Sequence, residues 1–484
     1  MDEAIVILVV LILYKLLLVC IGLWAQKRNH NADDFLIGNR QLGPVVAAIS
    51  YSASSSSAWT LLGMSGIAYT IGLSSIWFVV GSVFGMIISW TFIAPSVMRL
   101  SHQHKLTTIS DIIVLGISGP WRTAITVIAS LTIVACFAFY VAAQLQGAGQ
   151  TFNHAFDIKI NNSIIIGSII VLIYTLLGGF WAVSVTDTIQ GLLMLLAAIL
   201  LPITAYLKLG GFENFWLSYS QIASASELSW FNNQVGLAAL GLVVGILGVS
   251  LGTFGQPHLL VRFMALKDVK ALVQARIIAV TWFAFVFGGM FFLGLAGRIF
   301  VNQLDNSESI FIILTEQLFS PILAAIIIAS LLSAIMSTAD SQLLAGATAI
   351  SHDLGLGRHR RGHEILISRI AITAILLTSC LIALTIPATI FNRALLSWSA
   401  LGAAFGPIII CRVSGLKPSA SAIFISMLSG LFCVVWFHFN PDSLSMLIDP
   451  ATLPGSTFER VGSFLMGILI LLFSHYKNNK MPKP

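Results

Sequence analysis

The chain has 484 residues, of which 57% are hydrophobic and only 9% are charged. Because an ordinary soluble domain carries about 25% charged residues, this composition excludes a soluble globular protein and predicts an all-α polytopic membrane protein, with the lipid bilayer as its surroundings. The net charge of +6 is too dispersed to indicate a nucleic-acid partner, and its sign matters mainly through which connections hold the basic residues.

Apolar runs of about 20 residues, the length that a bilayer requires, recur from the start of the chain to its end. We expect thirteen membrane-spanning helices joined by short polar connections. Their approximate ranges are 4–26, 43–69, 74–98, 121–150, 162–179, 182–207, 233–257, 272–300, 320–350, 366–387, 390–411, 418–438 and 460–476.

Basic residues lie mainly in the connections that follow odd-numbered runs and in the C-terminal tail. The connection after the seventh run, for example, holds Arg262, Lys267 and Lys270. Cytoplasmic loops of membrane proteins carry an excess of Lys and Arg. We therefore expect the C-terminus in the cytoplasm and the N-terminus outside, in a cell membrane of the inner, cytoplasmic type.

Two runs are interrupted by residues that do not favour a helix. Six serines lie within residues 50–57, in the second run. Four glycines and a proline lie within residues 245–258, at the end of the seventh run. Serine hydroxyls compete for backbone hydrogen bonds, and Gly and Pro weaken a helix. Two breaks separated by five spans indicate an inverted repeat whose half-helices meet near the middle of the membrane. Close packing through small residues is the alternative.

The ninth run carries polar side chains on one helical face. Ser333, Ser337, Asp340 and Ser341 share this face at helical spacing. Sodium is a hard cation that prefers oxygen ligands, as other hard cations do, so hydroxyls here and backbone carbonyls freed near Ala53 suit it. Serines in membrane helices also bond back to their own backbone, and that alternative stays open.

Three charged residues lie deep in apolar runs: Lys15, Asp187 and Asp340. A charge at the centre of a membrane helix costs about 2.5 to 3.5 kcal/mol on insertion scales, so such residues usually mark ion or proton pathways. A helix cap is the alternative for Asp187. For Lys15, we expect a side chain that reaches back to the membrane surface.

Several motifs in order along the chain resemble the sodium:solute symporter family, and the closest resemblance is to its sodium/proline symporters. The motifs occupy residues 33–44, 178–190, 255–264, 336–341 and 402–407. The resemblance implies thirteen spans, of which the second to eleventh form two five-helix inverted repeats of the LeuT type, each with a discontinuous first helix. It also implies transport by alternating access. The corresponding domains would be 1–42 (peripheral helix and cytoplasmic loop), 43–230 (first repeat with an extracellular loop), 231–413 (second repeat) and 414–484 (two helices and a cytoplasmic tail).

The same resemblance implies ligands for sodium. The first site would use the backbone oxygens of Ala53, Ser56 and Ala334 and the hydroxyls of Ser337 and Thr338. In family members with a second sodium, the matching residues are Asp187, Ser337, Asp340 and Ser341, although the family has a hydroxyl where this chain has Asp340. Two close carboxylates need a shared cation or a proton between them, because like charges disfavour joint ionisation.

Other positions bear on the solute. Sodium/proline symporters carry an aspartate where this chain has Ser55 and aromatic residues where it has Val249 and Thr253. We expect the solute to contact Ser54, Ser57, Tyr140, Gln144, Thr253, Gln256 and Trp398.

The resulting hypothesis is sodium-coupled symport of a small organic solute, either an amino acid such as proline or a small carboxylate. Sodium is a co-substrate, and no organic cofactor is expected. Proton coupling through Asp340 and a membrane sensor that binds solute without moving it are the alternatives. An enzyme is not expected, because no nucleophile, base and oxyanion site are assembled.

Overall fold

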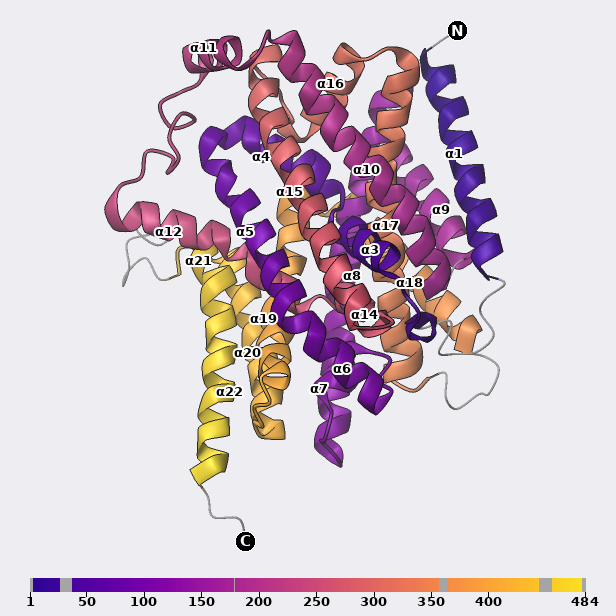
Figure 1. The fold of residues 1–484 in the computed structure, drawn as a ribbon, viewed down its shortest axis with the longest axis vertical. Helices are drawn as coiled ribbons and strands as arrows, with labels where there is room; N and C mark the ends of the chain where they lie inside the picture. The colour runs from indigo at the N-terminus through magenta and orange to yellow at the C-terminus, as the bar shows by residue number, and fades with distance from the viewer. Residues whose placement is uncertain (1–2, 27–36, 178, 357–363, 444–454, 481–484) are drawn as a thin grey trace.

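The computed structural model describes residues 3–26, 37–177, 179–356, 364–443 and 455–480. Apart from an isolated bridge between Leu42 and Leu266, the regular structure of these residues is helical. Residues 33–36 and Gly178, which belong to two of the motifs above, lie outside the described part of the chain. The long helices lie side by side in one bundle, with α1 at one edge and α20 and α22 at the other (Figure 1).

The elements follow one another with short connections. The first are α1 Glu3–Gln26, η1 Gly38–Arg40, α3 Pro44–Ser55, η2 Trp59–Gly63, α4 Met64–Ile71, η3 Gly72–Ser75, α5 Ile76–Ile88, η4 Ser89–Ile93, α6 Ala94–His104 and α7 Ile109–Ile113. The middle of the chain forms α8 Pro120–Phe156, α9 Ile160–Leu177, α10 Phe180–Lys208, α11 Phe212–Ile222, α12 Gly236–Leu247, α13 Val249–Gly252, η5 Thr253–Gly255, α14 Pro257–Ala265 and α15 Val269–Phe300. The remainder forms η6 Ser307–Ser309, α16 Ile310–Leu318, α17 Pro321–Thr348, η7 Ala349–Asp353, α18 Glu364–Thr385, α19 Ile390–Val413, α20 Ala420–Phe439, α21 Gly455–Thr457, η8 Phe458–Gly462 and α22 Ser463–Lys480.

Ten helices of the described chain are long and apolar enough to cross a membrane. Two shorter apolar helices, Ile5–Ile21 and Ile160–Leu176, fall below that length. The run Trp59–His104 is long enough for more than one crossing and turns at Gly72, whose φ is +62°. The polytopic all-α fold is confirmed, whereas the count of thirteen stays a prediction.

Both predicted breaks are present, and their backbone geometry is alike. Helix α3 ends at Ser55, and Ser56 has φ −100° and ψ 95° before the chain resumes in η2. The second broken helix runs through α12, α13 and η5, and Gln256 then has φ −86° and ψ 105° before α14. Pro257 begins α14 at a position where the missing N–H of proline costs nothing. Each break therefore contains an extended residue between two half-helices, as expected.

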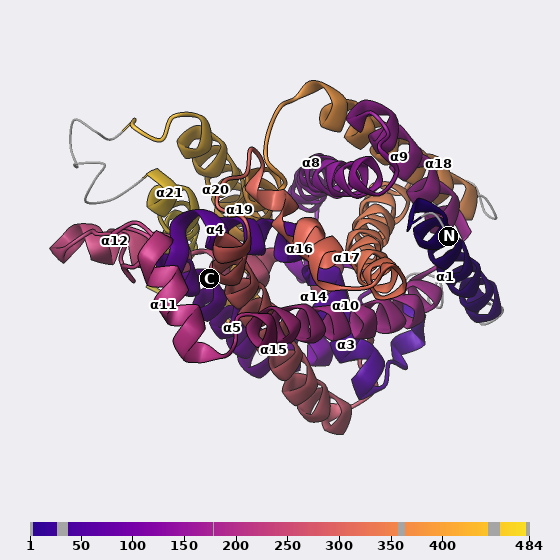
Figure 2. The ribbon, with the colours of Figure 1, turned by 90° about the horizontal axis from the view of Figure 1, so that it is seen from above.

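Helix α17 is the centre of the packing. It contacts α1, α3, α8, α10 and α18, and the view from above places it inside the bundle (Figure 2). In the most apolar 18-residue segment of α17, 83% of the residues are buried inside the protein. The corresponding value for the edge helix α22 is 28%. A polar residue on α17 is consequently enclosed by protein rather than lipid.

One residue lies where the sequence analysis did not place it. The sequence predicts Arg262 in a cytoplasmic connection, but it lies in α14 and is only 1% exposed. The predicted end of the seventh run at residue 257 is too early, because the break at Gln256 resembles the end of a span. The chain instead continues as a second half-helix, which buries the arginine.

Candidate functional site

The first break leaves a backbone carbonyl without its helical partner. In a regular helix the carbonyl of Ala53 accepts from the N–H of residue 57. Helix α3 ends at Ser55, and the N–H of Ser56 donates to the carbonyl of Ser52 at 2.9 Å. The Ala53 carbonyl therefore needs donors from elsewhere.

Two hydroxyl groups of α17 supply them. Ser337 Oγ donates to the Ala53 carbonyl at 3.1 Å and also lies 3.2 Å from the Ala334 carbonyl. Thr338 Oγ1 lies 3.5 Å from the same Ala53 oxygen. All four residues are fully buried. The structure thus brings together four of the five residues expected at the first sodium site.

The fifth residue, Ser56, forms the break itself. Its hydroxyl is buried and has no hydrogen-bond partner within the described chain. The ligand expected at Ser56 is its backbone oxygen, which lies in this extended residue of the break. The oxygens of this cluster are of the kind that a hard cation such as sodium prefers.

The residues expected at a second cation site are divided between two places. Asp187 Oδ2 is paired with Arg262 Nη2 at 3.0 Å and accepts from Ser50 at 2.8 Å and Ser54 at 3.0 Å. Arg262 also donates to Ser341 at 2.6 Å. Asp187 and Ser341 therefore share one cluster, and its cation is a guanidinium group of the protein.

Asp340 has different partners. Its Oδ1 accepts a hydrogen bond from Thr175 of α9, and its Oδ2 is buried without a hydrogen-bond partner among the described residues. The hydroxyl of Ser337 donates to the Ala53 carbonyl instead. A second sodium site at these four residues stays a prediction.

Arg262 is the functional residue that the sequence analysis missed. Its side chain connects α14 with α3, α10 and α17, so a single guanidinium group joins both broken helices. The available signal was local: Leu259, Leu260 and Val261 precede this arginine, and Phe263 and Met264 follow it. An arginine in such surroundings, directly after a helix break, indicates a buried charge rather than a loop.

A small closed cavity lies beside the first break. Its lining consists of Tyr51, Ser55, Trp59, Ser82, Met86, Val249, Thr253, Phe283, Phe287 and Trp398. Thr253 and Trp398 are the expected solute residues that face it. The indole of Trp398 donates to the Val249 carbonyl at 2.9 Å, and the side-chain amide of Gln256 donates to the Trp398 carbonyl at 3.1 Å. Gln256 therefore holds Trp398 in position without lining the cavity itself.

The other expected solute residues lie elsewhere around the break. Ser54 belongs to the Arg262 cluster. Ser57 Oγ lies 3.5 Å from Tyr140 Oη, and Gln144 accepts from the N–H of Ala58 at 3.0 Å. These contacts hold the interrupted backbone against α8 rather than lining the cavity. Four aromatic residues that the sequence did not single out, Tyr51, Trp59, Phe283 and Phe287, line the cavity together with Trp398.

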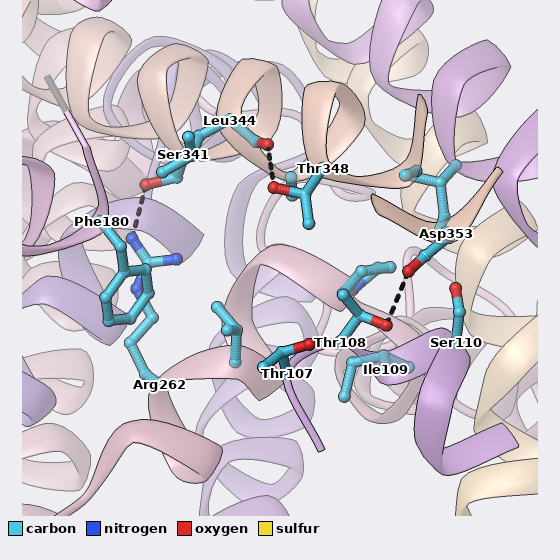
Figure 3. Close-up of a pocket in the computed structure, with 15 residues that line it drawn as sticks. Thr107, Thr108, Ile109, Ser110, Phe180, Arg262, Ser341, Leu344, Thr348 and Asp353 are labelled. Atoms are coloured by element: carbon cyan, nitrogen blue, oxygen red, sulfur yellow. Dashed lines mark hydrogen bonds between the residues drawn. The ribbon is translucent and has the colours of Figure 1, made fainter. Parts of the chain in front are cut away.

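A second, larger cavity extends from the Arg262 cluster toward α7 and η7. Figure 3 shows Arg262 and Ser341 at one end of it and Thr108 and Asp353 at the other. The Thr108 hydroxyl donates to Asp353 at 2.9 Å. The Arg262 cluster thus separates this cavity from the first break.

A bundle in which two helices are interrupted alike, around a buried set of oxygen atoms and a closed cavity, defines a secondary transporter of the inverted-repeat type. Residues 35–430 match the family model described as the sodium:solute symporter family. The chain belongs to the sodium:solute symporter family, and it is a sodium-coupled solute symporter.

Similar proteins agree with this assignment. Sodium/proline symporter 2 of Staphylococcus saprophyticus and the sodium/proline symporter of Staphylococcus aureus are each 31% identical to the chain over 445 residues, which is 88% of this chain and 85% of each relative. The structure resembles that of a Na⁺-coupled sialic acid symporter in a substrate-bound, outward-open state, with a TM-score of 0.78, 18% identity and 98% of each chain covered. It also resembles MhsT in complex with L-phenylalanine, with a TM-score of 0.58, 14% identity and coverage of 90% of this chain and 99% of the other. The expected LeuT-type fold is confirmed.

Proposed function

We propose that this protein takes up a small organic solute of the amino acid or small carboxylate class, driven by sodium bound at Ala53, Ser56, Ala334, Ser337 and Thr338. The observation that carries the site is the convergence of the Ser337 and Thr338 hydroxyls on the Ala53 carbonyl. Each hydroxyl can rotate and present a lone pair instead of its proton. Three hydrogen-bonding groups thereby become three sodium ligands.

Coupling follows from the position of this site. Ala53 lies in the last turn of α3, whose following break borders the closed cavity, whereas Ser337 and Thr338 lie on the central helix α17. A sodium ion between them favours the arrangement in which α3 is held against α17. A ligand shifts a conformational equilibrium by its differential affinity for the two states, so sodium and solute each favour the state that binds the other.

The solute class rests on the cavity and on the relatives. Five aromatic residues and the hydroxyls of Ser55, Ser82 and Thr253 line the cavity, so a solute bound here after the cavity widens would meet apolar ring faces and a few polar atoms. The sodium/proline symporters named above are similar to this chain, which favours proline among the amino acids. Ser55 is uncharged, and its hydroxyl donates its proton to the Ser52 carbonyl at 2.9 Å.

We also propose the cell membrane of a bacterial, inner-membrane type, with the N-terminus outside and the C-terminus cytoplasmic. Without Arg262, Lys267 in the connection after α14 and Lys270 in the first turn of α15 still lie on that side, so the excess of basic residues stays on the same side. The proposed repeats, 43–230 and 231–413, each begin with one of the two broken helices.

The experiment is uptake of radiolabelled L-proline into liposomes that contain the purified protein, with a sodium gradient, a proton gradient or neither. We expect accumulation only with the sodium gradient. Equal uptake without sodium would overturn the coupling, and uptake driven by a pH gradient alone would favour proton coupling. If proline is not transported, a thermal-stability screen of amino acids and small carboxylates with and without sodium identifies the solute, because a ligand of the native state stabilises it.

A further inference from the structure

Helix α1 carries a lysine in the middle of an otherwise apolar span. Lys15 is half-buried, while its neighbours Leu13 and Leu16 are 62% and 56% exposed toward the surface of the bundle. It lies in a crevice between α1, α9 and α17 whose other lining residues carry no charge, such as Leu8, Leu11, Ile170 and Leu332. An ammonium group in such surroundings needs a partner.

The expectation that this lysine reaches back to the membrane surface is wrong. Its Nζ points inward and contacts the sulfur of Met336 on α17. A thioether is only a weak acceptor, so the sulfur does not replace the lost hydration. The adjacent Tyr14 lies 2.5 Å from Ser333 through its hydroxyl, which fixes this face of α1 against the same helix.

Asp340 lies one helical turn beyond Met336 on α17. Residues four apart on a helix are neighbours on its surface, so the Lys15 ammonium group touches α17 one helical turn from the Asp340 carboxylate. The two groups do not form a direct ion pair, but they interact electrostatically through the buried interior. The Oδ2 atom of Asp340 is buried and lacks a hydrogen-bond partner among the described residues. An ammonium group without a strong acceptor and a carboxylate oxygen without a donor thus lie one helical turn apart along α17.

The same pattern occurs at the other carboxylate. Asp187 is neutralised by Arg262 at 3.0 Å. Each carboxylate of the predicted second cation site therefore has a protein cation in its surroundings, in a direct ion pair at Asp187 and one helical turn away at Asp340.

We propose that Lys15 is the tethered counter-ion of Asp340 and takes the place of a second sodium ion, so that this symporter binds one sodium per transport cycle. This inference rests on the proposed function, since it concerns the number of ions bound at and beside the proposed sodium site. Removal of the ammonium group leaves Asp340 uncompensated, with the Thr175 hydroxyl beside it. A free sodium ion can then take the position.

The test counts radioactive sodium bound to the purified full-length protein at saturation, without any solute. We expect about one ion per chain in the unaltered protein and about a twofold rise in Lys15→Met, since one uncompensated carboxylate recruits one hard cation. The neutral double variant Lys15→Met with Asp340→Ser should return to the original value. Lys208→Met, at the exposed end of α10, is the matched control and should leave the count unchanged.

The possible results are distinct. A count of about two in the unaltered protein, or an unchanged count in folded Lys15→Met, would overturn this inference and leave the proposed function intact. No sodium binding at all in the unaltered protein would reject the sodium site itself. If Lys15→Met does not fold, the double variant decides: recovery of a folded protein in which both charges are removed supports the pairing, and failure to recover it contradicts the pairing.

Discussion

At the scale of single residues, the hydroxyl of Ser337 has two carbonyls within 3.2 Å. Its removal takes one ligand from the proposed sodium site. Since an interaction with a charged group is worth about 1.5 to 3 kcal/mol, we expect Ser337→Ala to raise the sodium concentration for half-maximal uptake about tenfold or more. Uptake against sodium concentration measures this. Ser330→Ala is the control, because Ser330 is buried on the same helix but bonds only to its own backbone at Ile327; equal sodium dependence of both variants would remove Ser337 from the site.

The buried pair of Arg262 and Asp187 gives a second residue-scale prediction. Breaking a buried pair by removing one partner costs about 3 to 5 kcal/mol, because it leaves an uncompensated charge. We expect Arg262→Gln to lower the thermal stability strongly and Arg262→Gln with Asp187→Asn to recover most of it. Arg298→Gln is the comparison, since the Arg298–Glu227 pair at 2.9 Å is partly exposed and such pairs are worth about 1 kcal/mol or less. Similar losses in both single variants would contradict the distinction between the two pairs.

At the scale of elements, the second broken helix depends on glycine where it meets α19. A Cβ on Gly252 would lie 2.0 Å from the indole ring of Trp398, which lines the solute cavity. We expect Gly252→Ala to displace Trp398 and to reduce solute uptake more strongly than sodium binding. Gly288→Ala on α15 is the control, because nothing lies within 4 Å of its Cβ position. Unchanged solute affinity in folded Gly252→Ala would show that this contact does not shape the cavity.

The connection between α11 and α12 gives an element-scale prediction for pH. Burial alone would raise the pKa of Glu227, but hydrogen bonds from Ser224 and Arg298 outweigh it, so the pKa is lowered from its ordinary value of 4.5. A lowered pKa means that the contribution of Glu227 is present above pH 4.5 and is lost as the pH falls through the lowered value. Because the Glu227 carbonyl accepts from the N–H of Leu73 at 2.8 Å, we expect acid to loosen this connection from the α4–η3 turn. The rate of proteolytic cleavage in this connection, measured as a function of pH, tests the prediction. The rate should rise in acid in the unaltered protein, and Glu227→Gln should not show this rise. An identical pH profile in the two proteins would contradict the prediction.

At the level of elements, the sequence predicted where helices are broken, but it predicted much less about which residues of different helices contact each other. Serines and glycines within apolar runs indicate a broken helix directly, and Ala53, Ser337 and Thr338 followed from the matching motifs. Phe283 and Phe287 were not predictable, because the middle of α15 around them is apolar on all sides and nothing in its sequence marks the side that faces the cavity. Arg262 was misplaced because a break and the end of a span look the same locally. The contact between Lys15 and Met336 joins residues 321 positions apart, and single-sequence periodicity carries no information about such pairs.

At the scale of the whole molecule, sodium should act as a bridge between a broken helix and the central one. We expect sodium to slow amide hydrogen exchange in α3 and in the adjacent part of α17, compared with an equal concentration of choline chloride, because a bound ion opposes local opening. Exchange in the edge helix α22 should not change. The effect should be absent in Ser337→Ala, and equal protection by choline would contradict a specific sodium bridge.

The hydrogen bonds from Ser337 and Thr338 to the Ala53 carbonyl also bear on the part of the cycle in which the carrier returns unloaded. If the ion ligands of a transporter lose their partners when sodium leaves, the unloaded state is raised in free energy. The return of the unloaded carrier is then slow, and other ions can bind in place of sodium. Here two hydroxyls satisfy the carbonyl of Ala53 themselves, so release exchanges one set of bonds for another. The free energy of sodium binding is then the difference between the sodium-bound site and an empty site that keeps its own hydrogen bonds. This small difference favours a moderate sodium affinity and rapid release of the ion.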